Sequence, residues 1–307
     1  MGKKRILFMQ DTNILAIYGF ASLLGVSSSQ QLDFSSLGIV RKPGEKVGSI
    51  CRVTDASGRQ ITCNIEYNEF ETILKRITGV NDCANANGNS SFPGNINVLC
   101  VSIDPYIHTL EQSKGLVPEF INPKYLDSDP TLFQSPSRLE CMMQDLPKIM
   151  NSKMSVGYCS LPRWMCFSAA KNSEQNALIQ AQKTGFGESL FSMEEDFYKF
   201  FSRVLKDRIH CGSERMWDER TPAVGIPSTP VIVLSPDTAL TISEMQNCFE
   251  GVVEVKPNSI VYLKGRNAHL RNVVVDGAAI IQNSVEELCI VNNGWRFVHS
   301  DEDAMRR

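Results

Sequence analysis

The sequence has few histidines and no closely spaced cysteines, and both shortages narrow the chemistry that it can perform. The only histidines are His108, His210, His269 and His299. None is spaced as a metal ligand, and we expect no catalytic triad. The ten cysteines are scattered singly, without a CxxC pair. This pattern favours reduced, mostly buried thiols over a zinc site or a disulfide framework.

An excess of charge of one sign and long hydrophobic runs are also lacking. The chain has 31 basic and 34 acidic residues, a net charge of -3, which gives no field that would attract nucleic acid or an anionic membrane. No run approaches the roughly 18 apolar residues that a membrane span needs. The N-terminus passes from basic residues directly into a short apolar run, without a signal peptide. We therefore expect a soluble, cytosolic protein with neither nucleic acid nor membrane as a partner.

Strand and helix patterns alternate along the first two thirds of the 307 residues. The stretch KRILFMQ predicts a short buried strand, and residues 13–24 carry apolar residues at helical spacing. GSICRVTD and RQITCNIEY read as two strands joined by a hairpin turn at DASGR, in which Gly58 supplies the flexible position. A short helix over residues 70–77 and an apolar run in FPGNINVLCVSI follow. This alternation predicts an α/β layer with a largely parallel or mixed sheet.

The rest of the chain predicts two longer helices and then a region of short aliphatic runs. SRLECMMQDLPKIM predicts an amphipathic helix in which Ser137 and Glu140 have the spacing of a capping box. Residues 189–205 predict a second helix, because aromatic and aliphatic residues repeat at three and four. After Pro222, short aliphatic runs separated by Gly, Asn and Pro suit a small β-solenoid or sandwich. We place a domain boundary near residue 235.

Asp11 lies where the first predicted strand ends. Ligands collect at the carboxyl ends of strands in open α/β sheets, so this carboxylate is well placed to hold a hard cation such as Mg²⁺. A helix N-cap is the alternative, because aspartate also accepts hydrogen bonds from the free amides at a helix start.

A basic turn follows in VRKPGEKVGSI, where Arg41, Lys42 and Lys46 surround Gly44 and Gly48. Cations on a glycine-bearing turn can neutralise phosphate, and glycine lets a ligand approach the backbone closely. A solvated basic turn is the alternative.

Four further polar residues are candidates for ligand contacts. Glu66, Asn95 and Asn97 are of the types that read sugar hydroxyls, because carboxylates and carboxamides accept and donate in fixed directions. Lys171 follows an apolar strand, and its ammonium can offset the negative charge that grows on a transferring phosphoryl group. Turn, edge and surface positions are the alternatives for these residues.

Taken together and in order, seven short motifs resemble the nucleotide-sugar pyrophosphorylases, in particular the UDP-sugar pyrophosphorylases. They are QDTN, RKPGEKVG, IEYNEF, FPGNIN, NPKY, SPSRLECMMQD and AAKN. The resemblance implies that residues 1–235 are the C-terminal part of a Rossmann-like nucleotidyltransferase domain with a mixed sheet. Residues 236–307 would then be the small, left-handed β-helix-like domain of that family.

The resemblance also implies a reaction and roles. UTP and a sugar 1-phosphate would give a UDP-sugar and pyrophosphate, with alignment and charge neutralisation providing the rate. Asp11 corresponds to the acid that holds Mg²⁺ and Lys171 to the lysine that contacts the phosphates. Gly48 corresponds to a glycine of the sugar pocket, Glu66 to the acid that takes sugar hydroxyls, and Asn95, with Asn97 beside it, to the amide that orients the sugar.

The sequence departs from the family in one respect. The glycine-rich LxGGxGTRxG-like loop that holds the UTP phosphates belongs before QDTN, and nothing in the 307 residues resembles it. We therefore expect the C-terminal half of a UDP-sugar pyrophosphorylase, with no uridylyl transfer by these residues alone. The alternative is a non-catalytic sugar-phosphate-binding or regulatory module derived from this family.

Overall fold

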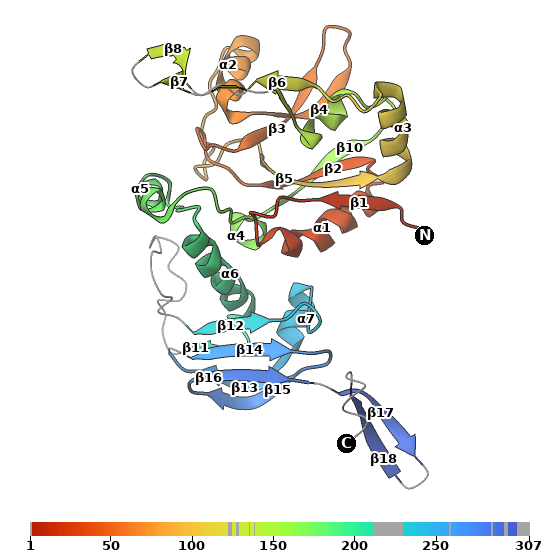
Figure 1. The fold of residues 1–307 in the computed structure, drawn as a ribbon, viewed down its shortest axis with the longest axis vertical. Coiled ribbons are helices and arrows are strands. Elements are labelled where there is room, and N and C mark those ends of the chain that lie inside the picture. The colour runs from red at the N-terminus through yellow and green to blue at the C-terminus, as the bar shows by residue number, and fades with distance from the viewer. Residues whose placement is uncertain are drawn as a thin grey trace. The chain divides into compact units, whose positions relative to one another are not determined.

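The computed structural model describes residues 2–121, 125–126, 129–134, 136–137, 139–211, 230–257, 259–283, 285–291 and 294–299. The chain divides into two compact units (Figure 1). The first comprises Met1–Asp11 and Gly19–Phe167, and the second comprises Thr12–Tyr18 and Ser168–Arg307, as far as these residues are described. The compact units divide after residue 167. The domain boundary expected near residue 235 is a different division of the chain and stays a prediction.

A mixed sheet of six strands forms the centre of the first unit. The strand order is β10-β2-β5-β3-β4, and β1 also pairs with β5. β10 is parallel to β2 and the other pairs are antiparallel, so the expected mixed sheet is confirmed, with antiparallel pairs predominating. The strands are β1 (Arg5–Phe8), β2 (Phe34–Ile39), β3 (Gly48–Thr54), β4 (Gln60–Ile65), β5 (Gly94–Ser102) and β10 (Val156–Leu161).

Helices and pairs of short strands lie between the strands of this sheet along the chain. The helices are α1 (Ala16–Ser29), α2 (Tyr67–Thr78), α3 (Ile103–Ser113) and the short α4 (Arg163–Cys166). The short strands are β6 (Glu119–Ile121), paired with β9 (Leu139–Cys141), and β7 (Tyr125–Leu126), paired with β8 (Asp129–Phe133). The predicted hairpin is confirmed: β3 and β4 pair in register, and Gly58 in their turn has a φ of 83°.

The prediction of an amphipathic helix from Ser137 onward is wrong. Glu140 lies in strand β9, where its register partner is Phe120, so Ser137 and Glu140 form no capping box. A 3₁₀ helix, η1 (Met143–Lys148), follows and contains Pro147. Proline lacks the N–H that an α-helix needs and clashes with the preceding turn, so the segment forms a short, tighter helix instead.

A hydrophobic cluster fixes η1 against the sheet. It consists of Phe34 from β2, Leu99 and Val101 from β5, Leu146 from η1, and Met150 just beyond it. All are at most 2% exposed, and burial of each such side chain contributes about 1.5–3 kcal/mol. The cluster therefore anchors the polar residues of η1 beside strand β4.

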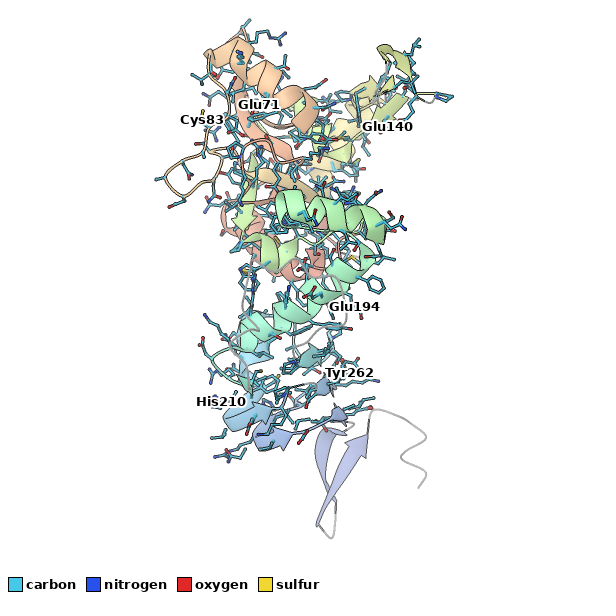
Figure 2. All side chains as sticks on the ribbon, turned by 90° about the vertical axis from the view of Figure 1, so that its left-hand side faces the viewer. Glu71, Cys83, Glu140, Glu194, His210 and Tyr262 are labelled. Carbon is cyan, nitrogen blue, oxygen red and sulfur yellow. The ribbon has the colours of Figure 1, made fainter. Side chains whose placement is uncertain are left out.

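The second unit contains two parallel three-stranded sheets that the chain visits alternately. One has the order β11-β13-β15 and the other β12-β14-β16. His210 on β11 and Tyr262 on β14 mark the two sheets in Figure 2. Their strands are β11 (His210–Cys211), β12 (Val231–Leu234), β13 (Phe249–Val255), β14 (Ile260–Lys264), β15 (Leu270–Val275) and β16 (Ala278–Gln282).

Three helices and a hairpin belong to the same unit. These are α5 (Glu174–Thr184), α6 (Leu190–Leu205) and α7 (Ile242–Asn247), with the antiparallel strands β17 (Val285–Val291) and β18 (Gly294–His299). The helix predicted over residues 189–205 is confirmed. Ser189 is its N-cap and forms a capping box with Ser192.

An aromatic cluster packs α6 within the second unit. The ring of Tyr18 stacks on Phe200 at a centroid distance of 4.1 Å, and Phe201 meets Tyr18 edge-on at 5.8 Å. Burial raises the pKa of Tyr18 to about 12, because the charged phenolate is poorly solvated there. The phenol therefore stays neutral and acts as part of the core.

No helix among the described residues is both long and apolar enough to cross a lipid bilayer. The nine cysteines whose side chains are described are free thiols.

We predict that Phe200→Ala destabilises the second unit by about 3–5 kcal/mol, because it leaves a cavity beneath a stacked ring. Phe191→Ala on the same helix is the control: Phe191 is 57% exposed, so its loss should change stability little. Chemical denaturation followed by circular dichroism measures both. Equal effects of the two substitutions would contradict the packing described here.

Candidate functional site

Three of the predicted site residues meet on the sheet of the first unit. Gly48 opens β3 and is the register partner of Asn95 in β5. Glu66 directly follows β4 and precedes α2. Its Oε1 atom lies 3.0 Å from the position that a Cβ atom on Gly48 would occupy. The structure thus brings Gly48, Glu66 and Asn95 to one place.

The side chain of Glu66 does not cap the helix that follows it. Glu66 is the N-cap residue of α2 but makes no side-chain capping bond. Instead, Oε1 accepts hydrogen bonds from Nδ2 of Asn64 at 2.6 Å and from Nε2 of Gln144 at 2.7 Å. Within the described part of the chain no donor reaches Oε2, so this second oxygen remains able to accept a hydrogen bond from a ligand.

Gly48 is required for space. A Cβ atom at this position would lie 2.5 Å from Oδ1 of Asn64 and 3.0 Å from Oε1 of Glu66. Its φ lies outside the left-handed region, so any residue could adopt the backbone conformation. Glycine therefore serves here to admit the close approach of the two polar side chains.

Asn95 and Asn97 shape the backbone of β5. Oδ1 of the buried Asn95 accepts a hydrogen bond from the backbone N–H of Asn97 at 2.9 Å. Asn97 has a left-handed φ of 56° and lies where the register between β2 and β5 shifts. The pair thus stabilises a β-bulge, and contact of either amide with a ligand stays a prediction.

Asn64 and Gln144 are the residues that sequence reasoning missed. Asn64 precedes Glu66 by two positions, so strand periodicity places both side chains on one face, which is a signal that the sequence contains. Gln144 comes from η1 and meets Glu66 across 78 positions. No local pattern identifies such a contact.

A cavity of about 470 Å³ adjoins Glu66 in the first unit. Its walls combine polar groups with apolar ones, among them Asn64, Glu66, Phe120, Met142 and Lys148. Lys148 is paired with Asp145 at 2.7 Å. A cavity that combines apolar walls with a few fixed polar groups is typical of a small-molecule site.

The basic turn of residues 41–48 is braced from within the first unit. Arg41 is 2% exposed and pairs with the buried Asp82, while its guanidinium lies 4.9 Å from the centre of the Phe70 ring. Glu45 forms an ion pair with Arg163. Arg41 therefore holds the turn in place, and the exposed Lys42 and Lys46 are the cations that this turn presents to solvent.

Asp11 is an exposed residue at the end of the segment that follows β1. The N-cap alternative does not hold, because α1 begins only at Ala16. No group of three or more metal-ligating side chains occurs among the described residues. Mg²⁺ commonly takes one or two protein carboxylates and completes its shell with water and phosphate oxygens, and a single exposed carboxylate fits that pattern.

Lys171 belongs to the second unit, where its backbone position is fixed. Its N–H donates to the carbonyl oxygen of Glu188 at 2.7 Å. Just before it, Ala170 donates to the carbonyl of Thr12 at 3.0 Å, and the N–H of Ser168 donates to Oδ1 of Asn13 at 3.0 Å. Residues 12–13 and 168–170 thus lie side by side within this unit. The NPKY motif falls almost entirely outside the described residues.

Comparison with solved structures indicates the class of fold. A crystal structure assigned as a UDP-N-acetylglucosamine pyrophosphorylase from Entamoeba histolytica matches with a TM-score of 0.54 and 18% identity. The match covers 84% of this chain and 57% of that one. The fold therefore resembles that of part of this pyrophosphorylase.

Comparison of sequences is more specific. The chain is 33% identical over 308 residues to a UDP-sugar pyrophosphorylase of Arabidopsis thaliana, covering 98% of this chain and 50% of the relative. A UDP-sugar pyrophosphorylase of Oryza sativa subsp. indica is 32% identical over 306 residues, covering 98% and 49%. No family model matches the chain. The predicted resemblance to the UDP-sugar pyrophosphorylases is confirmed, and the chain spans about half the length of these relatives.

We predict that Gly48→Ala destabilises the first unit by about 1–3 kcal/mol, because the methyl group forces Asn64 or Glu66 aside. Gly25→Ala in α1 makes the same change where no atom lies within 4 Å. It should be neutral or stabilise by up to about 1 kcal/mol. Thermal unfolding of both variants checks this, and a stable Gly48→Ala protein would show that the contact is not tight.

Proposed function

We propose that this chain provides the sugar-phosphate part of a uridylyltransferase site. The reaction is that of UTP with a sugar 1-phosphate to give a UDP-sugar and pyrophosphate. The main support is the 33% identity to a UDP-sugar pyrophosphorylase across 98% of the chain. The cluster of Gly48, Asn64, Glu66 and Gln144 beside a cavity of about 470 Å³ adds independent support.

In this proposal the first unit orients the sugar. Oε2 of Glu66 accepts hydrogen bonds from sugar hydroxyls, and a fixed acceptor discriminates strongly against a sugar that lacks the matching hydroxyl. Gly48 contributes to the sugar site by leaving room for Asn64 and Glu66, and the amides of Asn95 and Asn97 orient the sugar. A phosphate oxygen of the sugar 1-phosphate then attacks the α-phosphorus of UTP in line, the new P–O bond forms, and pyrophosphate leaves.

Asp11 and Lys171 are the proposed phosphate-side residues. Asp11 would hold Mg²⁺, which neutralises phosphate charge when bound. The ammonium of Lys171 offsets charge that develops on the transferring group. Within the second unit, the N–H of Ala170, which precedes Lys171, donates to the carbonyl oxygen of Thr12.

We also propose that residues 236–307 of this chain include a short left-handed β-helix made of β13–β16, which β11 and β12 extend before the expected boundary near residue 235. The strict alternation of strands between two parallel sheets supports a coiled path. A cytosolic location agrees with the scattered free cysteines.

A non-catalytic sugar-phosphate-binding module is the second candidate. It is favoured by the lack of any glycine-rich LxGGxGTRxG-like loop in the 307 residues. Both candidates require sugar-phosphate binding near Glu66, and they differ in whether uridylyl transfer follows.

We predict that glucose 1-phosphate or UDP-glucose binds saturably to this chain and that Glu66→Gln weakens binding roughly 10- to 100-fold, because a charged acceptor is lost. Glu69→Gln, at an exposed position beside the same cavity, is the matched control and should bind as the unaltered chain does. Isothermal titration calorimetry measures all three. Equal affinity of the Glu66 and Glu69 variants would refute the assignment of Glu66.

We predict no uridylyl transfer above background when this chain is assayed alone with UTP, Mg²⁺ and glucose 1-phosphate, because no glycine-rich phosphate loop is present. Chromatography detects any UDP-glucose that forms. Its formation would contradict this prediction and favour the transferase. In that case Asp11→Ala should abolish the Mg²⁺-dependent rate, and Lys171→Ala should lower it by about 10²-fold. Lys153→Ala, at an exposed lysine of the first unit, is the control.

A further inference from the structure

We infer that Gln144 and Asn64 are positioning residues, which hold Glu66 through one carboxylate oxygen so that the other oxygen is presented to a ligand hydroxyl. This inference rests on the proposed function and adds two residues to it. Nδ2 of Asn64 and Nε2 of Gln144 donate to Glu66. Both residues therefore act on the ligand through Glu66.

The arrangement of donors is what points to this role. A carboxylate has two oxygens and about four acceptor positions, yet both amides donate to Oε1. Two donors from different directions fix the rotation of the carboxylate group about its terminal bond. Oε2 is thereby held in one direction. Glu66 itself lines the cavity of about 470 Å³.

Both donors come from rigid parts of the first unit. Asn64 lies in the paired strand β4 and is 4% exposed, while Gln144 lies in η1 and is 7% exposed. η1 is anchored by Leu146 and Met150 in the hydrophobic cluster. Buried, packed supports of this kind hold a binding group in its productive geometry before the ligand arrives.

Asn64 keeps its hydrogen bond to Glu66 although its own carbonyl oxygen is left without a partner. Its Oδ1 atom is buried and has no hydrogen-bond partner. Turning the amide over would place this oxygen against Oε1 of Glu66, where two acceptors would repel each other. The chain therefore leaves one buried acceptor unsatisfied, an arrangement that disfavours folding, while the donor to Glu66 is kept.

The test compares hydroxyl discrimination in three proteins. Calorimetry gives the dissociation constants of glucose 1-phosphate and of its 2-, 3-, 4- and 6-deoxy analogues for the unaltered chain, Gln144→Met and Gln60→Met. Methionine has the length of glutamine but no N–H donor. Gln60 is the exposed first residue of β4, so the control makes the same chemical change away from Glu66. Thermal unfolding of each protein reports whether it is folded.

We expect the unaltered chain and Gln60→Met to bind glucose 1-phosphate at least about tenfold more tightly than one of the deoxy analogues. Gln144→Met should remain folded and lose most of this ratio, since Glu66 can then rotate. A folded Gln144→Met protein with the full ratio overturns the inference and leaves the proposed function intact. A chain that binds none of these sugars overturns both.

If Gln144→Met does not fold, Asn64→Leu takes its place in the same comparison, because it removes the second donor at nearly constant volume. Loss of the ratio in a folded Asn64→Leu protein supports positioning through Glu66. An unchanged ratio overturns it.

Discussion

The hydrogen bonding of a single oxygen, Oε1 of Glu66, organises the site in the first unit. Strand β4 places Asn64 two positions before Glu66 on the same face, and the 3₁₀ helix η1 brings Gln144 from far along the chain. Gly48 leaves the space that this meeting needs. Each of these elements has an ordinary structural cause, namely hairpin register, a proline inside a short helix and a missing Cβ atom. Together they produce an arrangement in which Oε1 of Glu66 accepts two hydrogen bonds and Oε2 accepts none from the described residues.

The turn that leads into Gly48 is fixed by charges that solvent does not reach. Arg41 and Asp82 are both buried, and Ser90 bridges them by donating to Asp82 and accepting from Arg41. Such a pair adds little net stability, since desolvation offsets much of the attraction, but removal of one partner leaves an uncompensated charge. The pair therefore acts mainly as a constraint on position. It sets the path of the turn, and so the start of β3, in a way that apolar packing alone would define less sharply.

Local patterns predicted the elements that depend on neighbouring residues. The hairpin at Gly58 and the helix begun by Ser189 follow from turn chemistry and capping, and the structure confirms both. The helix expected from Ser137 failed because Pro147 and the pairing of β9 with β6 outweighed the apolar spacing. Motifs predicted Gly48, Glu66 and Asn95 as site residues, which stays a prediction. They did not single out Gln144, because its contact with Glu66 depends on tertiary packing of η1. A local sequence pattern carries no information on a contact that spans 78 positions.

In the proposed site, the charges of the first unit would also orient a ligand that carries both hydroxyls and a phosphate. The carboxylate of Glu66 accepts hydrogen bonds from hydroxyls but repels phosphate, since like charges at short range are unfavourable. The exposed Lys42 and Lys46 lie on the turn that ends at Gly48 and have the opposite preference. A sugar 1-phosphate that places its hydroxyls against Oε2 of Glu66 must therefore direct its phosphate away from that carboxylate. In the proposed site, the orientation of a sugar 1-phosphate would thus depend on the fixed carboxylate of Glu66 together with the lysines of the turn.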